Sequence, residues 1–418
     1  MLIGIDLSLE EITYGLAAEG SFIDKAAIFS RLRSRRSCTV TRVTSRLSRW
    51  LMFFLLDCAV IAAAADEKRL ETPARYLGSA TCSSSSCHGG AGERHNQFLI
   101  WSQRDFHTKA FLILTTARST QIARSLGIEN AEQSPRCTVC HSPLATIAQS
   151  RLVSSEQHDT GVACESCHGP AEPWLRSHTR RDYTYPMRVG SGMRDLRNIY
   201  VRANACVACH QVVDNQIAAS GHPPLFFELT TQMRFEPPHW RELGESPVRT
   251  WLAGQATALR ELSWNSVLHN GDSSDALDPQ RAALVWLLAK ATALDTSLPK
   301  ISEGAPLDTM QQMADQLARR ASARDLSGLS ASKLLHALAS SGSDFSGPTF
   351  RPAGALFYYG KRLVLALEAL TSEGEMNSRY SSEIRQLRTD VATASSFDPS
   401  AFVRDLESLR VKLEAERR

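Results

Sequence analysis

The sequence predicts a mainly α protein with two unlike parts behind an N-terminal leader. Eight cysteines lie in the stretch from Cys82 to Cys209, whereas residues 246–418 contain none. The cysteine-rich stretch is broken up by Gly, Pro and Ser, and the cysteine-free stretch has apolar residues at helical spacing. We therefore divide the chain into a leader (1–65), an irregular module (66–245) and an α-helical bundle (246–418).

The leader has the layout of an export signal. Seven arginines in residues 31–49 precede an apolar run at 51–65 that ends in four alanines. A basic region, a short apolar region and a small-residue exit are typical of a cleaved secretory peptide, so we expect a periplasmic protein. The net charge of +3 gives no reason to expect nucleic-acid binding. No apolar run reaches the length of a membrane-spanning helix.

Three segments of the module read Cys-x-x-Cys-His. Two thiols one helical turn apart can each add to one vinyl group of the same porphyrin, and the histidine that follows can bind the iron. At the residue frequencies of this chain, about one chain in a hundred would contain such a pentapeptide by chance. The segments are Cys137, Cys140 and His141; Cys164, Cys167 and His168; and Cys206, Cys209 and His210.

A fourth segment, Cys82 to Cys87 followed by His88, has four serines between its cysteines. This wider loop can still bring both sulfurs to one haem, and it precedes three standard segments. We therefore predict four covalent haem c groups packed into the irregular module. Zinc and disulfides are the alternatives for the cysteines, but neither explains a histidine after each second cysteine.

Each haem iron has a second axial position, for which eight further histidines are available. Our first choices as distal ligands are His107, His178 and His222. A histidine at this position leaves no free coordination site, and a methionine would raise the reduction potential. The second choices are His95, His158 and His239, then His269 and His336, with Met187, Met193 and Met233 as alternatives.

The module resembles the tetrahaem cytochrome c family whose member accepts electrons from hydroxylamine oxidoreductase, and related multihaem cytochromes. The likeness covers about 75–245 and rests on Tyr-Leu-Gly at 76–78, the segment 101–110, the run Gly-Val-Ala-Cys-Glu-Ser-Cys-His-Gly-Pro at 161–170, and the fourth site. The resemblance implies three distal pairings and one open iron: His178 with the haem of His168, His107 with that of His210, His222 with that of His88, and no distal ligand at that of His141.

The cysteine-free part is expected to form a bundle of five to seven helices. Asp278-Pro279 and Asp398-Pro399 are typical of an N-cap followed by a first helical residue. Gly/Ser-rich stretches at 325–332 and 340–347 are expected to be loops. The core stripes are Leu307, Met310, Met313 and Leu317, and Phe402, Leu406, Leu409 and Leu413.

Four haems in about 180 residues must lie close together, which predicts electron transfer between redox partner proteins. Two other classes stay open: an oxidoreductase acting on a small nitrogen or sulfur compound at the iron of His141, and a structural or sensory subunit whose helical part docks a soluble or membrane redox partner. Seven arginines against two aspartates in residues 176–202 predict a docking face, contacts to haem propionates, or a solvated basic surface.

Overall fold

The computed structural model describes residues 73–154, 158–240, 244–268, 277–302, 304–323, 326, 328–346, 353–372 and 374–416. The expected leader, 1–65, and His269 lie outside these ranges. Residues 72–418 form one compact unit, and the mainly α fold class is confirmed. Among the described residues, no helix combines the length and apolar character needed to cross a membrane.

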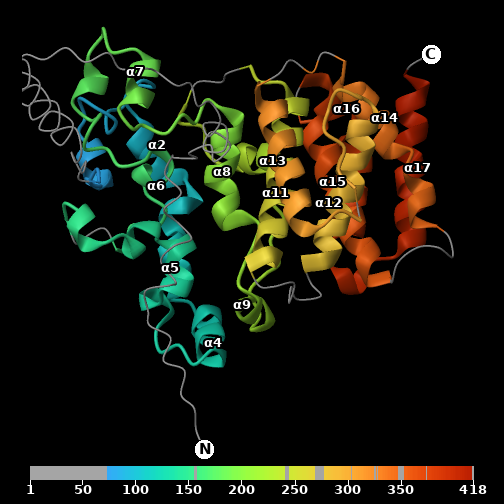
Figure 1. Ribbon diagram of the computed structural model, residues 1–418, viewed down its shortest axis with the longest axis horizontal. Coiled ribbons are helices and arrows are strands. Elements are labelled where there is room, and N and C mark those ends of the chain that lie inside the picture. Colours follow the sequence, from blue (N-terminus) through green and yellow to red (C-terminus); the bar gives the residue numbers. More distant parts are fainter. Residues whose placement is uncertain are drawn as a thin grey trace, which may run out of the picture. The chain divides into compact units, whose positions relative to one another are not determined.

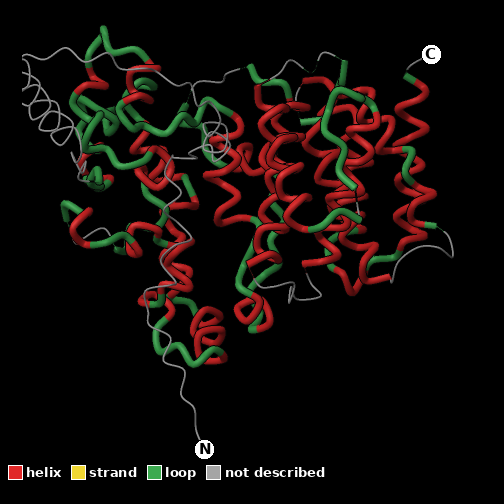
Figure 2. The backbone as a smooth tube through the Cα atoms, in the orientation of Figure 1, coloured by secondary structure: helices red, strands yellow, loops and turns green. Residues whose placement is uncertain are grey.

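The first part of the described chain is built from short helices joined by long loops (Figures 1 and 2). Its longest helix is α8, and the pairing of Tyr76 with Leu152 is an isolated β-bridge. Gly or Pro follows several of these short helices within two residues, among them α4, α5, α6, α9 and α10, as expected from the sequence. The helices are α2 (Gln97–Arg104), α3 (Ala110–Leu114), α4 (Ala117–Ser125), α5 (Pro135–His141), α6 (Cys164–His168), α7 (Tyr185–Gly190), α8 (Ile199–His210), α9 (Asn215–Ala219) and α10 (Leu229–Phe235).

The second part consists of longer helices, seven among the described residues. Phe402, Leu406, Leu409 and Leu413 are buried, which confirms the last predicted stripe. Asp398 caps the last helix by accepting from Ser400 N at 2.8 Å, whereas Asp278 lies inside its helix, not at the N-cap. The helices are α11 (Pro247–Leu268), α12 (Leu277–Ala293), α13 (Leu307–Ala323), α14 (Ala331–Ala339), α15 (Ala353–Leu370), α16 (Gly374–Asp390) and α17 (Pro399–Ala415).

The apolar core of the helical part continues across residue 245. Ile199, Ala203 and Val207 of α8 are buried in the same cluster as α11 and α13. Leu229 of α10 packs so closely on Gly254 of α11 that a Cβ there would lie 2.9 Å from the Leu229 Cβ. The helix that ends in His210 is therefore part of the bundle core.

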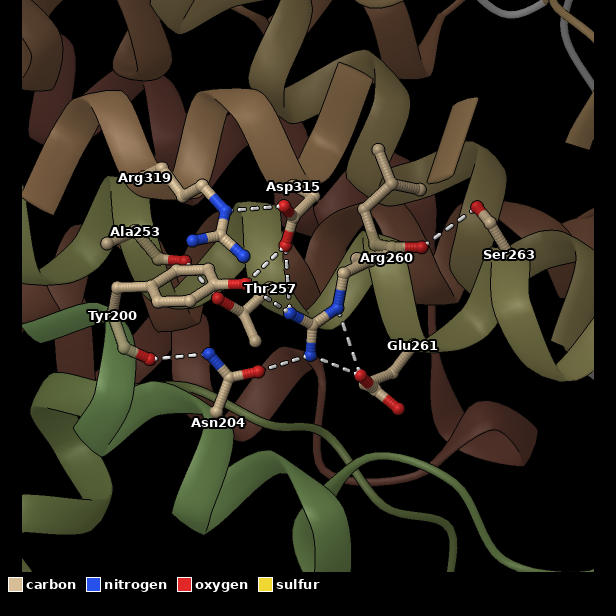
Figure 3. A network of polar contacts seen from close by, with 10 residues as sticks. Tyr200, Asn204, Ala253, Thr257, Arg260, Glu261, Ser263, Asp315 and Arg319 are labelled. Atoms are coloured by element: carbon tan, nitrogen blue, oxygen red, sulfur yellow. Dashed lines mark hydrogen bonds and ion pairs between the residues drawn. The ribbon is translucent and has the colours of Figure 1, made fainter. Parts of the chain in front are cut away.

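A polar network joins α8 to α11 and α13 beside this core (Figure 3). The Tyr200 hydroxyl donates to Asp315 at 2.6 Å, and Arg260 of α11 donates to Asp315 at 3.0 Å and to Asn204. Burial would raise the pKa of Asp315, but hydrogen bonds from Arg319, Tyr200 and Arg260 hold it below its ordinary value. The network fixes the register of α8 against both helices.

Arg362 of α15 is completely buried where the two parts meet. Its guanidinium donates to the Phe227 carbonyl at 2.7 Å and to Gln211 Oε1 at 2.8 Å. Burial lowers the pKa of Arg362 to about 9, and the nearby Glu228 partly offsets this. Since Gln211 directly follows His210, this buried charge lies close to the fourth Cys-His segment.

Two carboxyl groups meet between α16 and α17. Burial, together with the charge and hydrogen bond of Asp405, raises the pKa of Asp390 to about 6. The folded chain therefore binds a proton at Asp390 that the unfolded chain has lost once the pH exceeds its ordinary pKa of 3.8. The free energy of unfolding falls as the pH rises from that value to about 6, and it stays at the lower level above.

We expect Asp390→Asn to be more stable than the parent protein at pH 7.5, with a difference that shrinks as the pH falls to 4.5. The amide removes the repulsion that Asp405 exerts on an ionised Asp390. Thermal unfolding followed by circular dichroism at several pH values measures this. A stability difference that is constant over the whole pH range would contradict the assignment.

Candidate haem sites

The three standard Cys-His segments each lie at the C-terminal end of a helix. The motif occupies the end of α5 and of α8, and it makes up all of α6. Cysteines three residues apart on a helix share one face, so both thiols of a segment are presented to the same side. All eight described cysteines are free thiols, and none forms a disulfide.

The first segment uses a tight loop in place of a helix. The His88 N–H donates to the Cys82 carbonyl at 3.2 Å, which folds the four serines back and closes the wider spacer. Gly89 follows because a Cβ at that position would lie 1.8 Å from the Ser83 carbonyl oxygen. The longer spacer therefore brings the histidine next to the first cysteine.

Each motif histidine lies opposite a different histidine from elsewhere in the module. Two imidazoles that bind one iron from opposite faces have ring centres about 6.3 Å apart, because metal–nitrogen bonds are about 2.0 Å long and each ring nitrogen is about 1.15 Å from its ring centre. The observed distances between ring centres are 6.1 Å for His88 and His178, 6.1 Å for His210 and His107, 6.4 Å for His141 and His222, and 6.5 Å for His168 and His239.

Ordinary aromatic contacts fall in the same distance range, so a second observation is needed. In six of the eight rings, Nδ1 lies at hydrogen-bond distance from an oxygen acceptor, and the tautomer that donates from Nδ1 has its lone pair free on Nε2. The acceptors are Gln97 Oε1 for His88 (2.9 Å), the Ala110 carbonyl for His141 (2.9 Å), Asp105 for His107 (3.0 Å), the Leu175 carbonyl for His178, the Pro223 carbonyl for His222 (2.9 Å) and the Pro237 carbonyl for His239 (3.4 Å).

Burial keeps most of these rings neutral. It lowers the pKa of His168 and of His210 to about 4, and it also lowers those of His141, His178 and His239. A neutral ring can donate its lone pair to a metal without first losing a proton. The donor set, spacing and tautomers of the four pairs therefore fit a haem iron with two imidazole ligands.

Residues 81–169 match the family described as cytochrome c554 and c-prime. The match spans the first three Cys-His segments and ends just after His168. It confirms the resemblance inferred from the motifs, and it implies c-type haem in this segment. No curated protein and no solved structure gave a match.

Within the irregular module, the histidine pairs differ from those that the resemblance implied. Only His107, opposite His210, lies where it was expected. His178 lies opposite His88 instead of His168, because Gly169 at φ 81° turns the chain away immediately after the third segment. His222 lies opposite His141, the site that was expected to be open, and not opposite His88.

His239, a second-choice ligand in the sequence, belongs to one of the four histidine pairs. It is the partner of His168, and it adjoins Pro237-Pro238 just as His222 adjoins Pro223-Pro224. In both loops the Nδ1 of the histidine is bonded to a proline carbonyl. The shared pairing of histidine with Pro-Pro was the signal that could have identified His239.

The remaining candidates lie apart from the four pairs. His95 is exposed and its Nδ1 contacts the Cys87 carbonyl at 2.7 Å. His158 contributes its carbonyl to Ser142 at 2.6 Å. The other candidates are His336 on α14, Met187, which is 47% exposed, Met193, which is half-buried, and Met233, which packs on the bundle core.

Contacts between cysteines of different segments give the order of the sites. The thiols of Cys82 and Cys164 lie close enough to shift each other's pKa in opposite directions, as do those of Cys140 and Cys209. Burial raises the pKa of Cys167, and the neighbouring Cys206 raises it further. The sites therefore follow one another as first, third, fourth and second.

Side chains other than the motif cysteines and histidines hold two of these sites in place. The buried Glu165 accepts from the backbone N–H groups of Gly78 and Ala171, both at 2.6 Å, which ties the chain before the first site to the third segment. Arg118 donates to the Gly221 carbonyl at 2.6 Å, and Arg136 donates to Asp214 at 2.7 Å. These two arginines clamp the loop that places His222 opposite His141.

Proposed function

We propose that this protein is a periplasmic tetrahaem c-type cytochrome that passes electrons between redox partner proteins. The observation that carries the proposal is that every Cys-His segment has a second histidine at the spacing of a bis-imidazole iron. Bound haem would supply reversible one-electron chemistry at iron. The cysteine pairs would hold each porphyrin covalently, and the paired histidines would fill both axial positions.

Exposed apolar side chains beside the histidines support a porphyrin at these sites. Phe106, next to His107, is 74% exposed, and Phe235, close to His239, is 65% exposed. Exposed apolar surface beside metal ligands fits the binding of a large apolar group such as a porphyrin. A porphyrin at either site would bury this apolar surface.

The chain itself determines which irons could react with a small molecule. A substrate-binding iron needs a free axial position, and His222 lies at the position that the oxidoreductase alternative requires to be open. The proximity of Cys82 to Cys164, of Cys167 to Cys206 and of Cys209 to Cys140 supports electron transfer along one line of four sites. Together these features favour a carrier over an enzyme with its own substrate.

The test uses the full-length protein produced with the cytochrome c maturation machinery. We expect a pyridine haemochrome assay to give four haems per chain, and electron paramagnetic resonance of the oxidised protein to show low-spin haem without a high-spin component. The reduced protein should not bind CO. Zinc in place of iron would overturn the haem assignment, and a stoichiometric high-spin signal with CO binding would restore the oxidoreductase alternative.

A further inference from the structure

The order of the four sites makes the first and second sites the two ends of the electron path. The fourth site is attached to α8, whose opposite face is buried in the helical bundle. The third site lies between the first and the fourth. Partner proteins must therefore exchange electrons mainly at the first site, His88 with His178, or at the second, His141 with His222.

Exposed arginines flank His178, the distal histidine of the first site. Arg176, Arg180 and Arg181 flank His178 on both sides of its short 3₁₀ helix, and all three are exposed. Arg180 pairs with Asp182, whereas the structure gives Arg176 and Arg181 no carboxylate partner among the described residues. We call Arg176, Arg180 and Arg181 the distal arginine patch.

Other arginines of the basic segment have internal roles. Arg194 donates to the carbonyls of Ser166 and Cys167 at 2.7 and 3.0 Å. Arg202 forms an ion pair with Glu245. The basic segment of the sequence therefore divides into inward-facing arginines that hold the chain and a patch that faces solvent.

Two arginines near the second site make contacts within the fold. Arg118 donates to the carbonyl of Gly221, the residue before His222. Arg136 forms an ion pair with Asp214 at 2.7 Å. Both guanidinium groups are thus engaged within the protein.

We propose that the distal arginine patch docks an acidic redox protein at the first site. This inference rests on the proposed function, since it assigns a partner to one end of the electron path. Guanidinium groups bind carboxylates in a bidentate manner, and clustered charge of one sign steers an oppositely charged partner into place. Trp174, the tryptophan of this segment, is buried, so the patch lacks the aromatic anchor that is typical of membrane-bound surfaces.

The experiment compares two charge reversals of equal size in the full-length holoprotein. One variant is Arg176→Glu with Arg181→Glu, and the matched control is Arg320→Glu with Arg385→Glu, two exposed arginines of the helical part. The probe is reduced flavodoxin, a small acidic electron carrier, mixed with the oxidised cytochrome in a stopped-flow instrument. Dithionite, a small reductant, serves as the reference for intrinsic haem reduction.

We expect the second-order rate with flavodoxin to fall about tenfold in the parent protein between low and high ionic strength. The patch variant should be about tenfold slower than the parent at low ionic strength and equal to it at high ionic strength, because screening removes the charge effect. The control variant should stay within about twofold of the parent, and dithionite should reduce all three proteins at the same rate.

Three outcomes would overturn the docking proposal while leaving the proposed function intact. The patch variant could react like the control, or its defect could persist at high salt and accompany a shifted haem potential, as expected if these arginines bind propionates instead. Patch-dependent binding to phosphatidylglycerol vesicles without any effect on flavodoxin would identify a membrane surface. Failure of the proposed function would appear separately, as a wrong haem count or a high-spin iron in the parent protein.

Discussion

Replacing His222 by alanine should convert one of the four haems from low spin to high spin and create one CO-binding site per chain. The ring centre of His222 lies 6.4 Å from that of His141, and this pair consists of the motif histidine and one of the first-choice distal ligands. Loss of the distal imidazole leaves the iron with five ligands, and an iron with a free axial position binds CO. Magnetic circular dichroism and CO titration of the reduced protein measure both effects.

His95→Ala is the matched control, because His95 is an exposed histidine of the same module outside the four pairs. We expect this variant to keep four low-spin haems and to bind no CO. Identical spectra for His222→Ala and the parent protein would show that another group, or none, occupies the second site. His178→Ala should instead affect the haem of His88, which distinguishes the observed pairing from the one implied by the family resemblance.

Replacing Arg362 by alanine should lower the free energy of unfolding by about 3–5 kcal/mol, as for other buried charged networks that lose one member. The change removes one of two donors from the buried Phe227 carbonyl and from Gln211 Oε1, and it leaves space in a packed core. Denaturant unfolding followed at 222 nm measures the loss. Because Gln211 adjoins His210, the Soret absorbance should report the same transition.

Arg362→Met provides the informative comparison, since it keeps most of the volume and removes the charge. We expect it to be less damaging than alanine, although it also removes one hydrogen bond from each acceptor. Arg385→Ala, which removes an exposed arginine, should change stability by less than about 0.5 kcal/mol. An effect of Arg362→Ala no larger than that of the exposed control would refute the structural role of this network.

The parts of the fold that depend on local sequence could be predicted. Cysteines three residues apart, the stripe from Phe402 to Leu413 and the Asp398 cap each depend on neighbours within one or two helical turns. These features follow from helical geometry, and the structure agrees with them. The helix boundary at Leu277 differs from the expected start at Asp278 because capping signals locate a helix end only to within a residue or two.

The pairing of histidines could not be predicted, because it depends on contacts between residues far apart in the chain. His178 lies ten residues from His168, yet the turn at Gly169 carries it to the first site. His239 was undervalued because a lone histidine after two prolines has no local partner that reveals its role. The shared core across residue 245 was likewise invisible, since Leu229 contacts Gly254 only through the fold.

The four histidine pairs also close loops between residues that are far apart in the sequence. In sequence order, the first members of all four pairs precede the second members, and the two sets run in the same order: 88, 107, 141 and 168, then 178, 210, 222 and 239. Each pair closes a loop of roughly 70 to 100 residues, and every loop overlaps the other three. No loop can close until residue 178 is in place, and closing one loop lowers the entropy cost of closing the rest. The module is therefore ordered as one cooperative unit and not as four separable single-haem segments.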